Sequence, residues 1–470
     1  MRVLFVSWEY PPVVVGGLGR HVHHLATEMA AAGHDVVVLT RRPSGTDAVS
    51  HPTTDTVVEG VRVVAVAEDP PEFEFGQDMM AWTLAMGHAF VRAGLRVLHG
   101  AGSGASGPNL HGAGSGASGP NLHGAGSGAS GPNLHGAGSG ASGPNGHGAG
   151  SEPGARWVPD VVHAHDWLVA HPAIALAEFF DVPLVSTIHA TEAGRHSGWV
   201  SGRTNRQVHS VEWWLVSESD ALITCSASMR DEVHRLFGYD AADITVIHNG
   251  IDIRTWPFAE RSRTGGPAEL LFAGRLEYEK GVQDLLAALP RIRRSHPGTT
   301  LTVAGDGTQR DWLMEQARKH RVSKAVTFVG PVDHGELVTL MHRCDAIVLP
   351  SRYEPFGIVA LEAAATGAPL IVSTAGGLGE AVREPDTGLT FEPADVAGLA
   401  AAVRATLSDP GAAAQRALRA RARLTAEFSW AEVAERTASV HLAAKRRVRH
   451  AIGRPDIPER PLPERDPGQA

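Results

Sequence analysis

The sequence is poor in cysteine and has no excess of basic charge, and each shortage excludes a class of protein. Two cysteines in 470 residues, Cys225 and Cys344, cannot build a disulfide framework or a cysteine-rich zinc site. They fit a reducing compartment, so we expect a cytoplasmic protein. Lys and Arg total 42 against 51 Asp and Glu, a net charge of −9 with neutral His. Because nucleic-acid binding needs cations that neutralise phosphates, no nucleic-acid partner is expected.

Long apolar runs and several nucleotide motifs are also missing. No stretch approaches the roughly 18 apolar residues of a membrane-spanning helix, so no transmembrane segment is expected. Residues 1–7 are predicted to form a buried strand, which is too short, and too soon followed by Glu9 and Pro11, to be a signal peptide. The sequence has no G-x-x-x-x-G-K-[ST] loop, which disfavours ATP hydrolysis. It also has no Asp-x-Asp pair, the usual metal partner of a nucleotide-sugar diphosphate, so we expect neither a metal nor a cofactor.

Glycine is abundant instead, with 53 residues, and its excess lies in one segment. The 12-residue unit HGAGSGASGPNL recurs from His99, and residues 99–154 hold 20 of the 53 glycines. Each full copy offers at most one Leu, which is too little apolar surface to offset the entropy of ordering the chain. We therefore interpret 99–154 as a flexible Gly/Ser-rich insertion. A metal-binding tract built on its recurring His is the less favoured alternative.

Outside this insertion, buried strands alternate with helical patterns, which predicts an α/β fold of parallel sheets with both faces covered. The pattern runs once through residues 1–250 and restarts after Ile251. We therefore expect two Rossmann-like, doubly wound domains that face a cleft, at 1–250 and 251–427. A last amphipathic helix is expected at 428–445, followed by a disordered, Pro-rich tail at 446–470. Because ligands bind at the carboxyl ends of parallel strands, the functional motifs should follow strands.

Two motifs of the first domain meet this condition. Gly16 and Gly17 follow the first strand and open a helix, where glycine lets a ligand approach the backbone and the helix N-terminus favours an anion. A simple tight turn is the alternative. The segment Asp160–Trp167 ends a strand in His163, His165 and Asp166, and the two histidines share one side of the strand. We favour a ligand contact there over two satisfied core histidines.

Three motifs of the second domain also follow strands. In Gly274–Gly281, Arg275 and Lys280 are two cations on one loop that can clamp a diphosphate. Glu354 and Glu362 frame a Pro-Phe-Gly turn at a helix start and can bind a sugar and a ribose. Ala375–Glu380 offers backbone N–H groups to a phosphate. Solvated charges, a helix cap and a tight turn are the respective alternatives.

Taken together, these motifs resemble glycosyltransferase family 4, the retaining, metal-independent nucleotide-sugar transferases with the GT-B fold. The resemblance rests on GGLGRH, DVVHAHDW, GRLEYEKG, the carboxylates Glu354 and Glu362, and GGLGE. Within the family, SWEYPPVVVGGLGRHVHHL and STIHATEAGRHSGW are most similar to the mycobacterial glycogen-synthase-like α-1,4-glucosyltransferases. The repeat at 99–154 has no counterpart in the family pattern.

The resemblance implies roles for individual residues. It implies four catalytic residues, namely His165, Arg275, Lys280 and Glu354. Arg275 and Lys280 would bind the donor diphosphate, and Glu354 the donor sugar. The other donor-binding residues that it implies are Gly16, Gly17, Val329, Gly330, Phe356, Gly357, Glu362 and Gly377. It places His189, Glu192 and Arg195 toward the acceptor.

The implied reaction is transfer of glucose, with retention, from ADP-glucose or UDP-glucose to an α-1,4-glucan or maltooligosaccharide. One alternative is a mannosyltransferase that uses GDP-mannose and a lipid or glycan acceptor. Another is a GT-B sugar-nucleotide epimerase or a binding module without transfer. The sequence leaves the donor base, the acceptor length and the oligomeric state open.

Overall fold

The computed structural model describes residues 1–13, 16–43, 49–67, 73, 75–98, 157–196, 198, 200–260 and 265–448. Within these ranges, the residues up to Leu95 and from Val158 onward form one compact unit. The repeat at 99–154, expected to be flexible, lies outside the described residues, as does the tail after Val448. Among the helices that are described, none is long and apolar enough to cross a membrane.

The first sheet has eight strands in the order β3-β4-β2-β1-β5-β6-β7-β8. Every pairing is parallel except that of β3 with β4. The strands are β1 (Arg2–Ser7), β2 (Asp35–Arg41), β3 (Thr54–Val58), β4 (Val61–Val66), β5 (Val161–His165), β6 (Leu184–Ile188), β7 (Ala221–Thr224) and β8 (Ile244–Val246).

The second sheet has six strands in the order β11-β10-β9-β12-β13-β14, all parallel. They are β9 (Glu269–Ala273), β10 (Thr300–Ala304), β11 (Val326–Gly330), β12 (Ala346–Leu349), β13 (Leu370–Ser373) and β14 (Leu389–Phe391). In both sheets the chain turns back on itself beside the first strand of the sheet, β1 or β9, which is the topology of two doubly wound domains.

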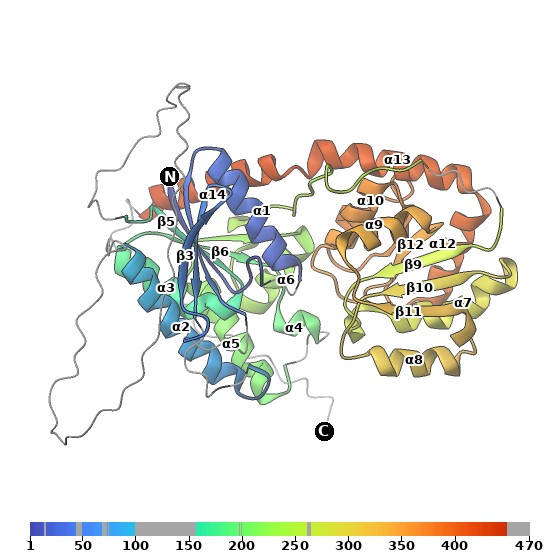
Figure 1. The fold of residues 1–470 in the computed structure, drawn as a ribbon, viewed down its shortest axis with the longest axis horizontal. Coiled ribbons are helices and arrows are strands. Elements are labelled where there is room, and N and C mark those ends of the chain that lie inside the picture. The colour runs from blue at the N-terminus through green and yellow to red at the C-terminus, as the bar shows by residue number, and fades with distance from the viewer. Residues whose placement is uncertain are drawn as a thin grey trace, which may run out of the picture. The chain divides into compact units, whose positions relative to one another are not determined.

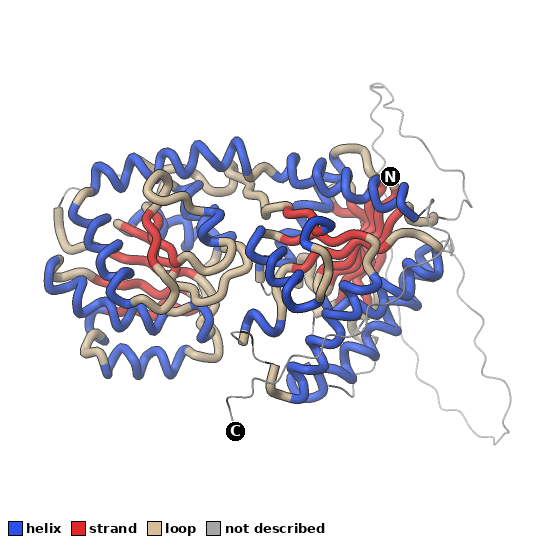
Figure 2. Tube along the Cα trace, turned by 180° about the vertical axis from the view of Figure 1, so that it is seen from behind, coloured by secondary structure: helices blue, strands red, loops and turns tan. Residues whose placement is uncertain are grey.

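The described helices cover both faces of these sheets (Figure 1; Figure 2). Their bounds are α1 (Gly17–Ala31), α2 (Phe75–Leu98), α3 (Ala170–Phe180), α4 (Glu192–Arg195), α5 (Arg203–Glu218), α6 (Ala227–Phe237), α7 (Val282–Ser295), α8 (Arg310–Lys319), α9 (His334–Arg343), α10 (Ile358–Thr366), α11 (Leu378–Ala381), α12 (Val396–Ser408), α13 (Pro410–Glu427) and α14 (Trp430–Val448).

Continuous apolar runs explain the central strands, because a parallel sheet with helices on both faces leaves no solvated side. In β1, five of six residues are buried, and all five residues of β5 are buried. One core forms around β1 and α1, and another around β9, α7 and α12. The expected α/β class and the pair of doubly wound sheets are confirmed.

The last helix, α14, packs on the first domain although it follows the second along the chain. It lies against α1 and β6, and Trp430, Val433 and Ala434 belong to the core around β1. Trp430 fits over Gly250, where a Cβ atom would approach the indole to 2.6 Å. The helix begins two residues after the expected Phe428 and continues through Val448, so Arg446–Val448 are helical rather than part of a tail.

Two strands, β3 and β14, lack the continuous buried run of the central strands. The strand β3 is antiparallel and mostly exposed, and its polar TDTVV sequence lacks the buried pattern used to recognise the others. The strand β14 has three residues and a single fully buried side chain, Phe391. Both lie at sheet edges, where one neighbour is missing and the sequence is under less constraint.

Candidate functional site

A cleft of about 870 Å³ lies where the carboxyl ends of strands from both sheets meet. Its walls include Gly16, Gly17, His165, Asp166, His189, Glu192 and Arg195 from the first domain, and Gly274, Arg275, Lys280, Glu354, Phe356 and Gly357 from the second. Eleven of the fifteen predicted site residues therefore lie in the cleft wall. Val329, Gly330, Glu362 and Gly377, which the resemblance also assigned to the donor, do not line this cleft.

The two cations of the second domain follow β9 on a short loop. Arg275 is half-exposed, and its Nη2 lies 3.5 Å from Glu279 Oε1. Lys280 closes a single 3-10 turn, Tyr278–Lys280, just before α7 begins. The next residue, Gly281, has φ of 71°, and a Cβ there would approach the Pro350 carbonyl oxygen to 1.8 Å. Glycine is therefore required at this position for the loop to bring Lys280 against the strand β12.

Glu354 lies opposite Lys280, in the loop between β12 and α10. Lys280 Nζ donates to Glu354 Oε2 at 2.8 Å, and Ser351 Oγ donates to the same oxygen at 3.3 Å. Both side chains of the ion pair are more than four-fifths buried. A cation and a carboxylate are thus held in contact in the cleft wall, where a bound diphosphate and a sugar hydroxyl can each take over one partner.

Glu362 occupies a different environment from Glu354. It lies on α10 with 1% of its surface exposed, and Arg20 Nη1 of α1 donates to its Oε1. Burial raises the pKa of Glu362, while the guanidinium of Arg20 opposes that rise. Arg20 itself lines the cleft and carries this contact from the first domain to the second. Arg20 is not among the predicted site residues, because its partner lies 342 residues away along the chain and only the structure shows the contact.

The glycines predicted at the donor site divide into two groups. Gly17 lies at the start of α1, and a Cβ there would meet Ile358 Cδ1 of the second domain at 2.9 Å. Gly377 lies behind the Glu354 loop instead: its N–H donates to the Glu354 carbonyl at 2.9 Å. That amide is already hydrogen-bonded to the loop, so Gly377 supports the loop and does not form the cleft surface.

Val329 and Gly330, at the end of β11, lie outside the cleft lining. The Val329 side chain is exposed, and the Gly330 carbonyl accepts a hydrogen bond from the Gly305 N–H.

The two histidines of β5 have different surroundings, although their imidazole rings stack with centroids 4.4 Å apart. His163 is fully bonded inside the core, through Nε2 to Thr187 Oγ1 at 2.8 Å and through Nδ1 to His441 Nε2 at 3.0 Å. It is a satisfied core histidine, so the expected ligand contact does not apply to it.

His165, in contrast, has one ring nitrogen that makes no hydrogen bond to the described residues. Its Nδ1 lies 3.1 Å from His189 Nε2, but its Nε2 is buried without a hydrogen-bond partner among the described residues, and the residue lines the cleft. Burial first, and then the neighbouring His163, hold the pKa of His165 well below its usual range, so the ring is neutral. A buried nitrogen left without a partner costs about 1–3 kcal/mol. A ligand hydroxyl at this nitrogen removes that cost.

Asp166 completes this wall and was not among the predicted site residues. Its backbone has φ of 61° and ψ of 174°, a conformation that is otherwise almost confined to glycine. Its carboxylate accepts a hydrogen bond from the His189 N–H at 2.7 Å. Burial raises the pKa of Asp166 to about 7. The group therefore fixes the backbone of His189, one of the residues assigned to the acceptor side.

The acceptor-side residues follow β6 and enter the same cleft. His189 is half-buried, and desolvation lowers its pKa to about 4. Glu192 and Arg195 lie on the one-turn helix α4, where Glu192 Oε1 is 3.2 Å from His196 Nε2. All three line the cleft together with Asn249, which bonds to His21. The structure thus brings the expected acceptor residues to the wall that also carries His165.

One group of side chains in the described residues has the geometry to hold a metal ion. Single ligand atoms of His21, His165 and His189 lie within 4.8 Å of one another. In this structure His21 Nδ1 bonds to Asn249 Oδ1 at 2.8 Å, and His165 bonds to His189. One nitrogen of each imidazole is therefore engaged in a hydrogen bond, while His165 Nε2 has no partner among the described residues. The expectation of a metal-independent site stays a prediction.

The buried histidines predict how stability depends on pH. Burial lowers the pKa of His189 to about 4 and that of His441 to about 3, whereas both titrate near 6.5 when unfolded. As the pH falls through 6.5, these two histidines therefore take up protons in the unfolded chain before they do so in the folded protein. Their contribution to the free energy of unfolding is complete above pH 6.5 and is lost as the pH falls. Each group contributes up to about 1.4 kcal/mol per pH unit.

We expect His441→Gln to be less stable than the parent at pH 7.5, with a deficit that shrinks by about 1.4 kcal/mol per pH unit below 6.5. Urea unfolding of both proteins from pH 7.5 to 5 measures it. Taking the difference cancels Asp166 and Glu212, whose pKa values are raised to about 7 and which act in the opposite direction. A constant deficit across this range contradicts the assignment of His441 as a neutral core group.

Comparison with known proteins places this geometry in context. The model "Glycosyl transferases group 1" matches residues 254–425, "Glycosyltransferase Family 4" matches 155–255, and "Starch synthase catalytic domain" matches 2–86. The glycogen synthase of Mycobacterium tuberculosis is 62% identical over 465 residues, covering 99% of this chain and 100% of the relative. An uncharacterized glycosyltransferase of Methanocaldococcus jannaschii is 29% identical, over 94% and 98% of the two chains.

Solved structures share the arrangement of both domains at low sequence identity. Sucrose-phosphate synthase from Thermosynechococcus elongatus superposes with a TM-score of 0.70 at 21% identity, over 94% of this chain and 98% of that one. The catalytic domain of starch synthase IV from Arabidopsis thaliana, bound to ADP and acarbose, gives 0.65 at 17%, over 95% and 99%. These likenesses confirm the expected GT-B fold.

Proposed function

This chain belongs to the glycogen-synthase-like glycosyltransferases of family 4, and from that membership we propose that it transfers glucose, with retention, from ADP-glucose or UDP-glucose to an α-1,4-glucan or maltooligosaccharide. The observation that carries the proposal is the Lys280–Glu354 pair in the cleft wall, in a chain similar to a glycogen synthase over its whole length. A cytoplasmic location stays a prediction, in keeping with a chain of only two cysteines, both of them buried.

Donor binding is assigned mainly to the second domain. Arg275 and Lys280 bind the diphosphate, Arg275 by its fork and Lys280 as a point charge. Glu354 accepts hydrogen bonds from the donor sugar after Lys280 turns to the phosphate. Glu362 binds the ribose hydroxyls, which requires Arg20 to release or share that carboxylate, since the two are paired in this structure. Domain movement about the cleft can supply that change.

The chemical step needs no protein nucleophile. As the bond from the anomeric carbon to the phosphate oxygen breaks, negative charge builds on the diphosphate, and Arg275 and Lys280 stabilise it, the kind of electrostatic contribution that is usually the largest. The acceptor hydroxyl forms the new bond on the same face, and its proton passes to the departing phosphate oxygen. His165 offers its unpartnered Nε2 to a sugar hydroxyl next to the reacting carbon.

Single-turnover transfer tests the function directly. ADP-, UDP- and GDP-glucose and GDP-mannose are each mixed with short maltooligosaccharides or glycogen, and product length and nucleotide release are measured. We expect elongation by one glucose with an adenine or uridine donor, and nucleotide release that depends on the acceptor. Transfer from GDP-mannose alone would reassign the enzyme as a mannosyltransferase. Nucleotide release without any acceptor product would remove transfer from the proposal.

The insertion at 99–154 is predicted to be dispensable for this activity. It joins the end of α2 to the start of β5, whose opposite, carboxyl end carries His165 in the cleft. Replacing 99–154 by a short Gly-Ser turn should therefore leave kcat/KM within about twofold of the parent, since insertions at chain connections are well tolerated. Loss of transfer in a deletion variant that retains the parent melting temperature contradicts this.

A further inference from the structure

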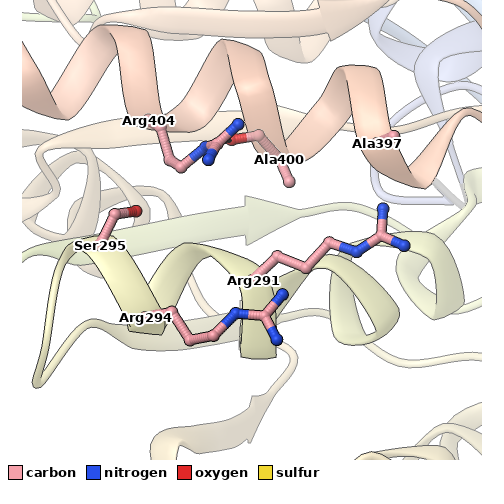
Figure 3. A pocket seen from close by; sticks show the side chains of 6 residues that line it. All are labelled: Arg291, Arg294, Ser295, Ala397, Ala400 and Arg404. Atoms are coloured by element: carbon pink, nitrogen blue, oxygen red, sulfur yellow. Dashed lines mark hydrogen bonds between the residues drawn. The ribbon is translucent and has the colours of Figure 1, made fainter.

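A second hollow, of about 280 Å³, lies between α7 and α12 of the second domain, and nothing in the proposed reaction uses it. Arg291, Arg294 and Ser295 line it from α7, and Ala397, Ala400 and Arg404 from α12 (Figure 3). None of these residues lines the catalytic cleft. We call this site the α7–α12 hollow.

Helical spacing explains why the lining side chains face one another. Residues three or four apart share a helix face, so Arg291 with Arg294 and Ser295, and Ala400 with Arg404, form two opposed rows. The alanines are short, which leaves room between the helices, while Arg404 Nε donates to the Ala400 carbonyl at 3.2 Å and so stays along the wall. Three guanidinium groups therefore surround one space (Figure 3).

Some exposed guanidinium groups of the same domain contact a carboxylate, as in Arg343–Glu269 at 2.9 Å, Arg383–Glu427 at 2.9 Å and Arg419–Asp386 at 2.6 Å. Within the described part of the chain, Arg291, Arg294 and Arg404 form no ion pair. Three like charges around one space repel each other, and in a chain of net charge −9 their grouping is not a consequence of basic composition.

We propose that the α7–α12 hollow binds a small phosphorylated metabolite through its phosphomonoester group. A guanidinium pairs with two phosphate oxygens at once, and a phosphomonoester offers three oxygens and a charge of about −1.5 to −2 at pH 7. The hollow, at about 280 Å³, has the volume of several water molecules of about 30 Å³ each, which is more than a phosphate group needs. The remaining space, lined by Ser295, Ala397 and Ala400, takes the organic part of the ligand.

Calorimetric titration of the full chain at low ionic strength tests the proposal, with ribose 5-phosphate and inorganic phosphate as probes and ribose as the uncharged reference. We expect ribose 5-phosphate to bind more tightly than inorganic phosphate, ribose not to bind, and binding to weaken as salt is added. Equal binding of inorganic phosphate overturns the assignment of an organic ligand. Equal binding of ribose, or no binding of either phosphate, overturns the site itself.

Variants locate the binding. The double variant R291A/R294A and the single variant R404A should each lose about tenfold or more in affinity for ribose 5-phosphate, because each removes charge-assisted hydrogen bonds. Arg293→Ala, on the same helix but outside the hollow, is the matched control and should bind like the parent. Lys280→Ala should also bind like the parent, which separates this hollow from the catalytic cleft. Loss in the Arg293 or Lys280 variant equal to that in the double variant contradicts the proposal.

Discussion

Lys280→Ala is expected to lower kcat/KM for glucosyl transfer by about a hundredfold or more, the scale of removing one donor that stabilises transition-state charge. The reason is the position of Nζ in the cleft wall, 2.8 Å from Glu354 and on the loop that also presents Arg275. In the proposed mechanism this ammonium faces growing negative charge on the leaving diphosphate. Steady-state kinetics with donor and acceptor varied separately measure the change.

Two further variants make this test specific. Lys319→Ala removes an exposed lysine of α8 in the same domain and should leave kcat/KM unchanged. Because Lys280 and Glu354 act as one unit, combining Lys280→Ala with Glu354→Gln should cost little more than the worse of the two single changes. Near-normal transfer by Lys280→Ala, or effects that add fully in the combined variant, would show that the pair does not clamp the donor.

His165→Ala is expected to lower kcat by about a hundredfold or more, with a smaller change in the KM of the donor. Nε2 of His165 has no hydrogen-bond partner among the described residues. In the proposed mechanism it bonds a sugar hydroxyl next to the reacting carbon, and the substitution removes that bond. His165→Gln, which keeps an amide in place of the ring, should recover part of the rate. The KM measurement separates a role in the chemical step from a role in donor binding.

His163 supplies the matched comparison for this prediction. It lies two residues earlier on the same strand, is equally buried, and is bonded to Thr187 and His441 rather than to the cleft. His163→Gln should therefore lower the melting temperature while leaving kcat within a few-fold of the parent, because its interactions are made inside the core. Equal losses of kcat in both variants would assign the effect of His165 to general packing of β5.

Much of the site could be predicted from the sequence because its residues follow strands. Arg275, Lys280 and Glu354 come directly after β9 and β12, and the carboxyl ends of parallel strands meet at one edge. The same reasoning found His165, but could not separate it from His163, since a two-residue period places both on one side. The two histidines differ because His163 is hydrogen-bonded to His441, which lies 278 residues further along the chain.

Contacts between distant segments account for the rest. Arg20 belongs to the motif GGLGRH, in which only the glycines were predicted to contact a ligand. Its partner Glu362 lies on α10 of the other domain. Gly377 was assigned to phosphate binding from a turn pattern that fits equally well a loop support, and its amide is bonded to Glu354. Local patterns predict the element on which a residue lies, and the partner across the cleft depends on how the two domains close.

The helix α14 has a consequence for how the protein is made. A ribosome completes residues 1–250 long before it reaches Trp430, yet Trp430, Val433 and Ala434 belong to the core around β1. Domains usually fold in the order of their synthesis. Here the first domain stays unfinished, with the surface around Gly250 and His163 uncovered, until the second has been synthesised and the chain has crossed back. The earlier-made domain is thus the later one to reach its final state, and a fragment that ends before α14 exposes apolar surface that the whole chain buries.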